Sequence, residues 1–253
     1  MKRILHLNVS TNAKRKATTG FTLIEVLVSL AILVTVTGAV LEQINSMQKK
    51  SASEAVNLDL NQQARDFMSQ TVRDLHMAGY PTASMYSVDP LARPSMVANR
   101  LVRVSSTEIL LEGDVNNDGA VESVDIAYVA NDPNDPNCPC IRRSAQAKIN
   151  ADSFNQPKNL LYTETQQVFP PGTQPGQSGE DLFEYYDQNG NTVPIGSGLD
   201  ISTPATSTTQ SGQALISSIK TVKINLTLLT NQRDPVTGNF VHTSMSASSR
   251  LNY

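Results

Sequence analysis

The sequence is poor in several residue types on which whole classes of protein depend. It contains no Trp, two Cys and three His among 253 residues, and only 17 % of the chain is charged. Two Cys are too few for a disulfide-rich scaffold, and together with three His they leave a zinc site built from Cys and His alone short of ligands. Hydrophobic residues make up 39 % of the chain. That proportion excludes a disordered polypeptide.

Sequence motifs for catalysis are absent as well. The chain has no nucleophile elbow, no phosphate-binding loop and no HExxH sequence. We therefore expect it not to be an enzyme. The net charge of −3 also gives no electrostatic reason to expect a nucleic-acid partner.

The small net charge conceals an uneven distribution. The first 20 residues contain five basic residues and no acidic one, whereas the remaining 233 contain 15 basic and 23 acidic residues. A chain that lost its first 20 residues would therefore carry a net charge of −8.

Residues 21–41 form an apolar run in which the only charged residue is Glu25. Twenty-one residues of α-helix span about 30 Å, the thickness of the hydrocarbon core of a bilayer. Five positive charges precede the run, and only Lys49 and Lys50 follow it closely. The positive-inside rule therefore predicts a single-pass protein with a cytoplasmic N-terminus and an extracytoplasmic remainder.

Three interpretations of this N-terminus compete. One is a secretory signal cleaved near residues 37–39, although its apolar region would be long and would contain a carboxylate. The second is a plain membrane anchor. The third rests on Gly20-Phe21-Thr22-Leu23-Ile24-Glu25. This motif resembles the class III signal of type IV pilins and type II secretion pseudopilins, in which a short basic leader ends in Gly and is followed by Phe, a Glu at the fifth mature position and an apolar helix.

The resemblance implies cleavage after Gly20 by a prepilin peptidase and methylation of the new Phe21 amine. It divides the chain into a leader (1–20), a transmembrane and amphipathic helix (21–80) and an extracytoplasmic β-rich domain (81–253).

Glu25 needs a partner if it lies within the membrane, because a carboxylate at the centre of a span costs about 2.5–3.5 kcal/mol. In a helical stack of subunits, Glu25 of one chain can meet the Phe21 amine of its neighbour. That pair would offset the cost and set the axial register. The alternative is that Glu25 extends to the lipid headgroups, since it lies four residues from the start of the span.

Residues 42–80 contain no Pro, and no Gly before Gly79. Apolar residues recur there mostly at three- and four-residue steps, which predicts an amphipathic helix continuing from the span and ending at Gly79 and Pro81. We expect the distal half of its apolar stripe to pack on a sheet. The stripe consists of Ile44, Met47, Ala55, Leu58, Phe67, Met68, Val72, Leu75 and Met77.

Beyond residue 81 the pattern changes to short strand-like segments. We expect one or two strands over 101–111, a strand at 124–129 paired with 140–148 across a turn at 131–137, and strands at 182–186, 216–229 and 240–251. Turns are expected at Asn189-Gly190 and at 234–238, and exposed loops at 170–179 and 196–212. The predicted fold class is α+β, a long N-terminal helix packed on an antiparallel sheet.

This order of elements, with FEYYDQNGN from residue 183 and the closing TVKINLTLLTNQRDPVTGNF and SRLNY, is similar to the PilW-type minor pilins. The J-type minor pseudopilins of type II secretion have a similar size and layout. The resemblance implies a minor subunit that helps to initiate type IV pilus assembly at the tip. Its partners would be major and minor pilins, the prepilin peptidase and the inner-membrane assembly platform. A calcium-dependent adhesin anchored by a pilin helix is a third option.

Residues 114–125 have the spacing D-x-N-x-D-G-x-V-x-x-x-D. In EF-hand-type loops, oxygens at positions 1, 3, 5, 7 and 12 converge on one Ca²⁺, and Gly at position 6 permits the turn. The loop resembles the dockerin version, which implies as ligands Asp114, Asn116, Asp118, the Ala120 carbonyl, Glu122 directly or through water, and Asp125. The chain has one such loop rather than two, and a strand-like segment follows it. The alternative is an Asx-rich hairpin that turns at Asp118-Gly119 without metal.

Cys138-Pro139-Cys140 would lie in an oxidising compartment. A labile intramolecular bridge, free or intermolecular thiols, and a metal site remain open for this pair. Asn225-Leu226-Thr227 is a glycosylation-type sequon, but the alternation around it predicts a strand, and we expect no modification there.

Overall fold

The computed structural model describes residues 20–82, 85, 94–133, 135–136, 138–157, 162–169, 181–206 and 210–252. Most of the predicted leader, and the loop predicted at 170–179, lie outside these residues. The chain divides into two compact units, residues 1–49 and 50–253.

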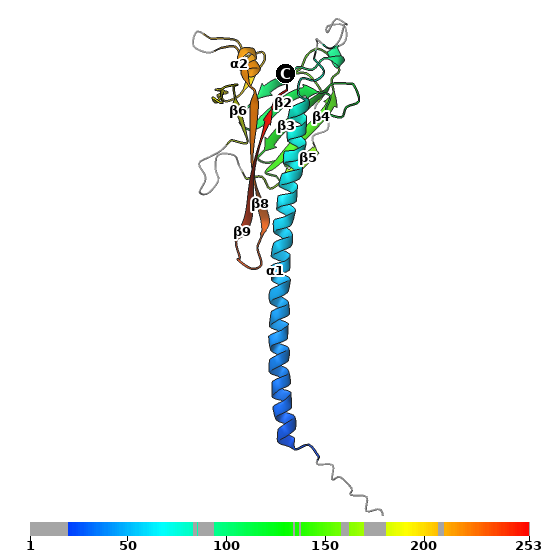
Figure 1. Ribbon diagram of the computed structural model, residues 1–253, viewed down its shortest axis with the longest axis vertical. Helices are drawn as coiled ribbons and strands as arrows, with labels where there is room; N and C mark the ends of the chain where they lie inside the picture. The colour runs from blue at the N-terminus through cyan, green and yellow to red at the C-terminus, as the bar shows by residue number, and fades with distance from the viewer. Residues whose placement is uncertain are drawn as a thin grey trace, which may run out of the picture. The chain divides into compact units, whose positions relative to one another are not determined.

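One helix, α1 (Leu23–Met77), contributes to both units and confirms the helix predicted over 21–80 (Figure 1). In the first unit its large apolar side chains are exposed, from 82 % for Leu23 to 45 % for Ile44. This part of α1 is long and apolar enough to span a membrane, and none of that apolar segment is buried within the chain.

Backbone contacts with β2 fix the C-terminal end of α1. Gly79 has a φ of +82°, and its N–H donates to the Glu112 carbonyl at 2.7 Å. A Cβ added at Gly113 would lie 2.3 Å from the Met77 carbonyl oxygen, so the two backbones approach closely. The predicted stop at Gly79 is therefore confirmed, because only glycine adopts this left-handed conformation at no steric cost.

The first sheet of the second unit is antiparallel and has the order β5-β4-β3-β2-β1-β7. The predicted segment 101–111 forms two strands, and the predicted pairing of 124–129 with 140–148 is confirmed. The sequence did not predict β5 or β7. The strands are β1 (Leu101–Val104), β2 (Glu108–Gly113), β3 (Glu122–Val129), β4 (Cys140–Ala147), β5 (Tyr162–Gln166) and β7 (Leu199–Asp200).

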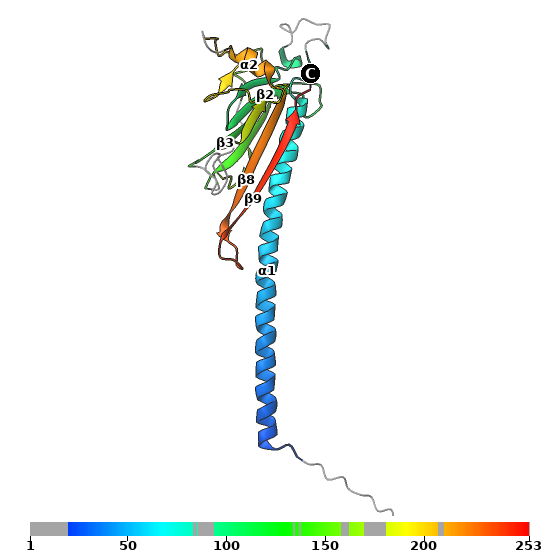
Figure 2. The same ribbon diagram turned by 60° about the vertical axis from the view of Figure 1, so that its left-hand side comes forward.

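The second sheet is also antiparallel and has the order β6-β8-β9, formed by β6 (Phe183–Tyr186), β8 (Thr221–Arg233) and β9 (Phe240–Arg250). The β8–β9 hairpin runs beside the C-terminal half of α1 in both views (Figures 1 and 2). The Thr243 hydroxyl donates to Asn61 Oδ1 at 2.9 Å, which ties β9 to the helix.

The prediction of a strand over 216–229 was wrong at its start. Ile216 lies in a short helix, α2 (Gly212–Ser218), and β8 begins at Thr221. Ser211 caps α2 by accepting the Ala214 N–H on its Oγ at 3.3 Å. The loop predicted at 196–212 likewise contains β7 and the first residue of α2, so it is not wholly an exposed loop. A further short 3₁₀ helix, η2, covers Pro94–Met96.

The hydrophobic core of the second unit joins α1, α2 and both sheets in one cluster. Phe67, Met68 and Leu75 of the predicted stripe are buried, whereas Leu58 is 71 % exposed. The packing predicted for the distal half of the stripe is therefore confirmed at these three residues, whereas Leu58 lies in the proximal half. The helical residues buried in this unit are Leu60, Ala64, Phe67, Met68, Thr71, Asp74 and Leu75.

Two ion pairs with buried carboxylates connect elements that are distant in sequence. Asp74 of α1 accepts from Arg143 Nε of β4 at 2.7 Å and from Arg143 Nη2 at 3.1 Å. Lys148 Nζ lies 2.7 Å from Glu112 Oε2, and both side chains are almost wholly buried. Burial raises the pKa of Asp74 above its ordinary value, although Arg143 and Gln70 favour the ionised form.

Candidate functional site

The N-terminal motif lies at the start of α1. Gly20 and Phe21 precede the helix, and Phe21 is 81 % exposed. Thr22 Oγ1 accepts the Glu25 N–H at 3.3 Å, and the Thr22 carbonyl accepts the N–H groups of Glu25 and Val26. Thr22 is therefore the N-cap, and Glu25 occupies the third helical position, where a carboxylate is favoured by the helix dipole.

This cap was not predicted from the sequence, although its signal is present. Thr22-Leu23-Ile24-Glu25 has the S/T-x-x-E spacing that marks a helix N-terminus. The helix thus begins two residues beyond Phe21, the terminus that the expected cleavage would create, and the same Glu25 belongs both to the processing motif and to the first turn.

Hydroxyl groups in the apolar part of α1 are satisfied within the helix. Ser29 Oγ donates to the Glu25 carbonyl at 2.7 Å, Thr35 Oγ1 to the Ala31 carbonyl at 2.9 Å, and Thr37 Oγ1 to the Leu33 carbonyl at 2.7 Å. A polar group that bonds to its own backbone does not need water as a partner. These side chains are therefore compatible with an apolar environment.

The acidic loop at 114–125 connects β2 to β3 and is organised by its own carboxylates. Asp114 accepts the backbone N–H groups of Asp118 and Gly119 at 3.1 and 3.0 Å, and Asp118 accepts that of Ala120 at 2.8 Å. Gly119 has a φ of +88°, as position 6 of a calcium loop requires. The predicted turn at Asp118-Gly119 is present.

An amide lies between the carboxylates of this loop. Asn116 Nδ2 donates to Asp118 Oδ2 at 2.9 Å and to Glu122 Oε1 at 3.1 Å. Burial raises the pKa of Glu122, and the nearby Asp118 and Asp114 carboxylates raise it further, although the Val115 N–H lowers it. The loop thus crowds negative charge around one amide.

The remaining predicted ligand, Asp125, lies within β3, where it pairs with Leu110 and Ser144 in the neighbouring strands. No three of the loop's carboxylates at 114, 118, 122 and 125 have ligand oxygens within 4.8 Å of one another. The structure therefore brings Asp114, Asp118 and Glu122 to one loop without closing a metal shell.

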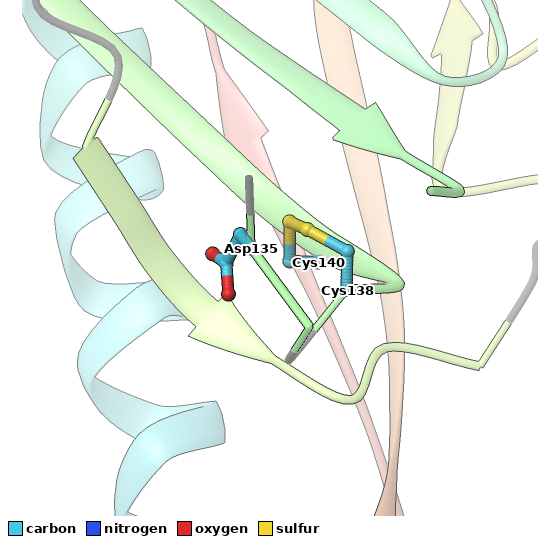
Figure 3. Close-up of side chains that lie close together, drawn as sticks. All are labelled: Asp135, Cys138 and Cys140. Carbon is cyan, nitrogen blue, oxygen red and sulfur yellow. A yellow bond between two sulfur atoms is a disulfide. The ribbon is translucent and has the colours of Figure 1, made fainter. Parts of the chain in front are cut away.

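The two cysteines form a disulfide in the structure (Figure 3). Cys140 begins β4 and is fully buried, whereas Cys138 is half-buried. Asp135 lies beside the pair. One carboxylate oxygen of Asp135 and the two Sγ atoms lie within 4.8 Å of one another. Of the three arrangements left open by the sequence, the structure has the intramolecular bridge.

The sequon at Asn225 lies in β8, as its alternation predicted. Its Nδ2 donates to the Asp181 carbonyl at 3.0 Å and to Glu184 Oε1 at 3.1 Å, and the residue is 8 % exposed. The Asn225 amide is therefore hydrogen-bonded within the folded unit.

Comparison with known proteins identifies the N-terminal segment. Residues 15–41 match the family described as the prokaryotic N-terminal methylation motif. Neither a curated protein nor a solved structure matches the chain. The match includes Gly20, Phe21, Glu25 and the apolar part of α1.

The matched motif supports a prepilin-type protein, the class that includes type IV pilins and pseudopilins. It implies processing by a prepilin peptidase and interaction with pilus components. Together with the exposed apolar helix, it is consistent with anchoring in a membrane.

Proposed function

We propose that this protein is a PilW-like minor subunit of a type IV pilus, which helps to start assembly and lies at or near the pilus tip. The observation that supports it is one continuous helix with two different surroundings. Its N-terminal part carries the prepilin-type motif and exposes its apolar side chains, whereas its C-terminal part is built into a folded domain. The role is structural rather than catalytic.

Processing and membrane insertion follow from the first 25 residues. The basic leader would hold the N-terminus in the cytoplasm while α1 crosses the inner membrane. Cleavage after Gly20 would release the Phe21 amine for methylation. The capped first turn then starts two residues beyond the new terminus, so cleavage removes none of the bonds that begin the helix.

Glu25 is the residue to which we assign assembly. It is the only charged residue within the apolar segment, and its position in the first turn is fixed by Thr22. In a stack of helices, its carboxylate would meet the Phe21 amine of the adjacent subunit. Pairing two opposite charges in an apolar environment removes the cost of leaving either one alone.

Deletion of the gene tests the role in assembly. We expect fewer pili on the cell surface, measured by shearing the cells and quantifying the major pilin, and restoration by the wild-type gene. Unchanged pili with lost export of secreted proteins would instead assign the protein to a type II secretion filament, as a J-type pseudopilin. Unchanged pili with lost adhesion would favour the anchored adhesin.

The variant Glu25→Ala tests the pairing. We expect normal membrane insertion and normal cleavage, measured from the mass of the mature chain, but no incorporation into sheared filaments. Glu42→Ala is the matched control, because Glu42 is the next carboxylate along the helix and follows the apolar run. Normal incorporation of Glu25→Ala would contradict the assigned role.

We also propose that the acidic loop binds Ca²⁺ in a structural role. The support is the crowding of Asp114, Asp118 and Glu122, whose mutual repulsion a cation would relieve. Rotation of the Asn116 amide would turn Oδ1 toward Asp118 and Glu122 as a ligand, with loss of the bond that Oδ1 accepts from the Asp118 N–H. Six oxygens around Ca²⁺ leave no nucleophile or base, so the ion would stabilise the fold only.

Calcium binding is tested by thermal unfolding of the full chain in detergent, with Ca²⁺ or with chelator. Because Ca²⁺ would bind the folded state alone, we expect it to raise the Tm, by the equivalent of about 2.7 kcal/mol at a hundredfold excess over Kd. Asp118→Ala should remove the rise, whereas Asp152→Ala, at an exposed carboxylate outside the loop, should keep it. No shift in the wild type at millimolar Ca²⁺ would refute the proposal.

A further inference from the structure

We propose that the pair Cys138 and Cys140, once reduced, forms with Asp135 a binding site for a thiophilic divalent cation such as Zn²⁺. The proposal rests on the convergence of three ligand atoms of the kinds that zinc prefers, two sulfurs and a carboxylate oxygen, within 4.8 Å of one another. It concerns a part of the molecule that the role in pilus assembly does not use.

The backbone explains why these three side chains meet. The Cys138 N–H donates to the Asp135 carbonyl at 3.3 Å, and the Asp135 N–H donates to the Asp132 carbonyl at 3.1 Å. These turns fold the end of the β3–β4 connection back on itself. Cys140 then opens β4, where it pairs with Val129 of β3 and Gln166 of β5. Cys140 is therefore fixed within the first sheet, whereas Asp135 and Cys138 lie in the connection that precedes β4 (Figure 3).

Neighbouring groups orient the carboxylate. The Thr163 hydroxyl donates to Asp135 Oδ2 at 3.1 Å, and Arg142 Nη2 lies 3.6 Å from the same oxygen. Arg142 also pairs with Asp132 at 2.5 Å. Such outer partners fix the direction of a ligand. The guanidinium also offsets part of the negative charge that two thiolates and a carboxylate bring together.

The dimensions suit a small ion. Zinc lies about 2.3 Å from thiolate sulfur and about 2.0–2.2 Å from carboxylate oxygen, which places tetrahedral ligands about 3.3–3.8 Å apart. Reduction would let the two Sγ atoms separate to this spacing without moving them out of the cluster. A cavity of about 310 Å³ adjoins the site and is lined by Pro136, Cys138, Pro139 and Val168, so an ion, a reductant and a water ligand can reach Cys138.

A dithiol can serve as the reductant of the Cys138–Cys140 disulfide. The donor supplies two electrons and two protons, the Cys138–Cys140 bond breaks, and the donor leaves as its own disulfide. Each Cys then loses its proton as its sulfur binds the cation. Sulfur ligands select zinc-like ions over Ca²⁺ and Mg²⁺, so this site would not compete with the acidic loop for calcium.

Cobalt titration of the full chain in detergent tests the site, because thiolate-bound Co²⁺ has a charge-transfer absorption that oxygen ligands do not give. The chain is reduced with dithiothreitol, freed of it without oxygen, and titrated. We expect the absorption to saturate at one ion per chain, to bleach when Zn²⁺ is added, and to be absent from the oxidised chain. A reduced chain without this absorption would overturn the proposal, as would loss of the folded circular dichroism spectrum on reduction.

Asp135→Asn tests the third ligand, and it leaves the disulfide available for folding. We expect the apparent Kd to rise at least about tenfold, because even outer-shell changes weaken metal binding by about 10–100-fold. Asp152→Asn is the control, since Asp152 is exposed and lies outside the cluster, and it should leave the Kd unchanged. An unchanged Kd in Asp135→Asn would contradict the three-ligand site.

Discussion

The two halves of α1 are built from similar apolar residues but have opposite surroundings. Between residues 23 and 49 the large apolar side chains are exposed, as with Leu33 at 63 %. Between residues 60 and 75 they are buried, with Leu75 at 0 % and Phe67 at 3 %. The chain therefore supplies the packing partner for the second half and not for the first.

The polar residues of the two halves of α1 also differ in where their hydrogen-bond partners lie. Ser29, Thr35 and Thr37 bond to the carbonyls of the preceding turn and so need no partner outside the helix. In the second half, Asp74 and Asn61 bond to β4 and β9, which fixes the helix against the sheets. The difference is consistent with a first half that is anchored in a membrane.

Truncating a buried side chain of the second half should have the largest effect. We expect Phe67→Ala to lower the free energy of unfolding of the second unit by about 3–5 kcal/mol, because it removes a large side chain from a packed core. The measurement is denaturant unfolding of the full chain in detergent, followed by near-ultraviolet circular dichroism.

Leu33→Ala is the matched variant in the first half. It also removes a large apolar side chain from α1, but from an exposed position. We expect no change in the unfolding of the second unit. An equal loss of unfolding free energy in Phe67→Ala and Leu33→Ala would contradict the difference between the two halves of α1.

Removing one member of the ion pair between α1 and β4 should have the next largest effect. Arg143→Met would leave the Asp74 carboxylate buried without its guanidinium, and we expect a loss of about 3 kcal/mol in the free energy of unfolding. Arg65→Met is the control, because Arg65 is an exposed cation of α1, the helix that carries Asp74. The same unfolding assay measures both, and equal losses would argue against a special role for the pair.

Much of this fold could be predicted from the sequence, because its main elements carry strong local patterns. The apolar run, the three- and four-residue steps and Gly79 predicted α1. Alternation predicted β8, a strand-like composition predicted β3, and the turn at 234–238 preceded the segment predicted as β9. The sequence did not predict β5, whose residues Tyr-Thr-Glu-Thr-Gln are almost all polar. Its pairing with β4 is set by tertiary structure rather than by a local pattern.

The start of β8 was missed for the opposite reason. Leu215 and Ile216 are apolar and adjoin a strand-like run, but Ser211 caps a helix turn that buries them. A short helix next to a strand has too few residues for its period to show.

The candidate sites also differ in how much of each could be predicted from the sequence. The processing motif is contiguous, and the family match supports it. The cysteine pair was recognisable, but its proximity to Asp135 depends on turns that the spacing alone did not indicate. In the acidic loop, the spacing predicted Asn116 as a ligand but did not predict that its Nδ2 donates to Asp118 and Glu122.

The smallest expected effect is the contribution of the Asp74 carboxyl to the pH dependence of the free energy of unfolding. Because burial raises its pKa in the folded state, the folded protein binds more protons than the unfolded chain at pH values above the ordinary pKa of 3.8. The stability contributed by this group therefore falls as pH rises from that value to the folded pKa, by at most about 1.4 kcal/mol per pH unit, and is constant above it. We expect the difference in unfolding free energy between wild type and Asp74→Asn to follow this slope, measured by denaturant unfolding at a series of pH values.

A difference that grows with pH would mean that Arg143 outweighs burial and holds Asp74 ionised, and the helix would then be joined to β4 by a full ion pair throughout the range.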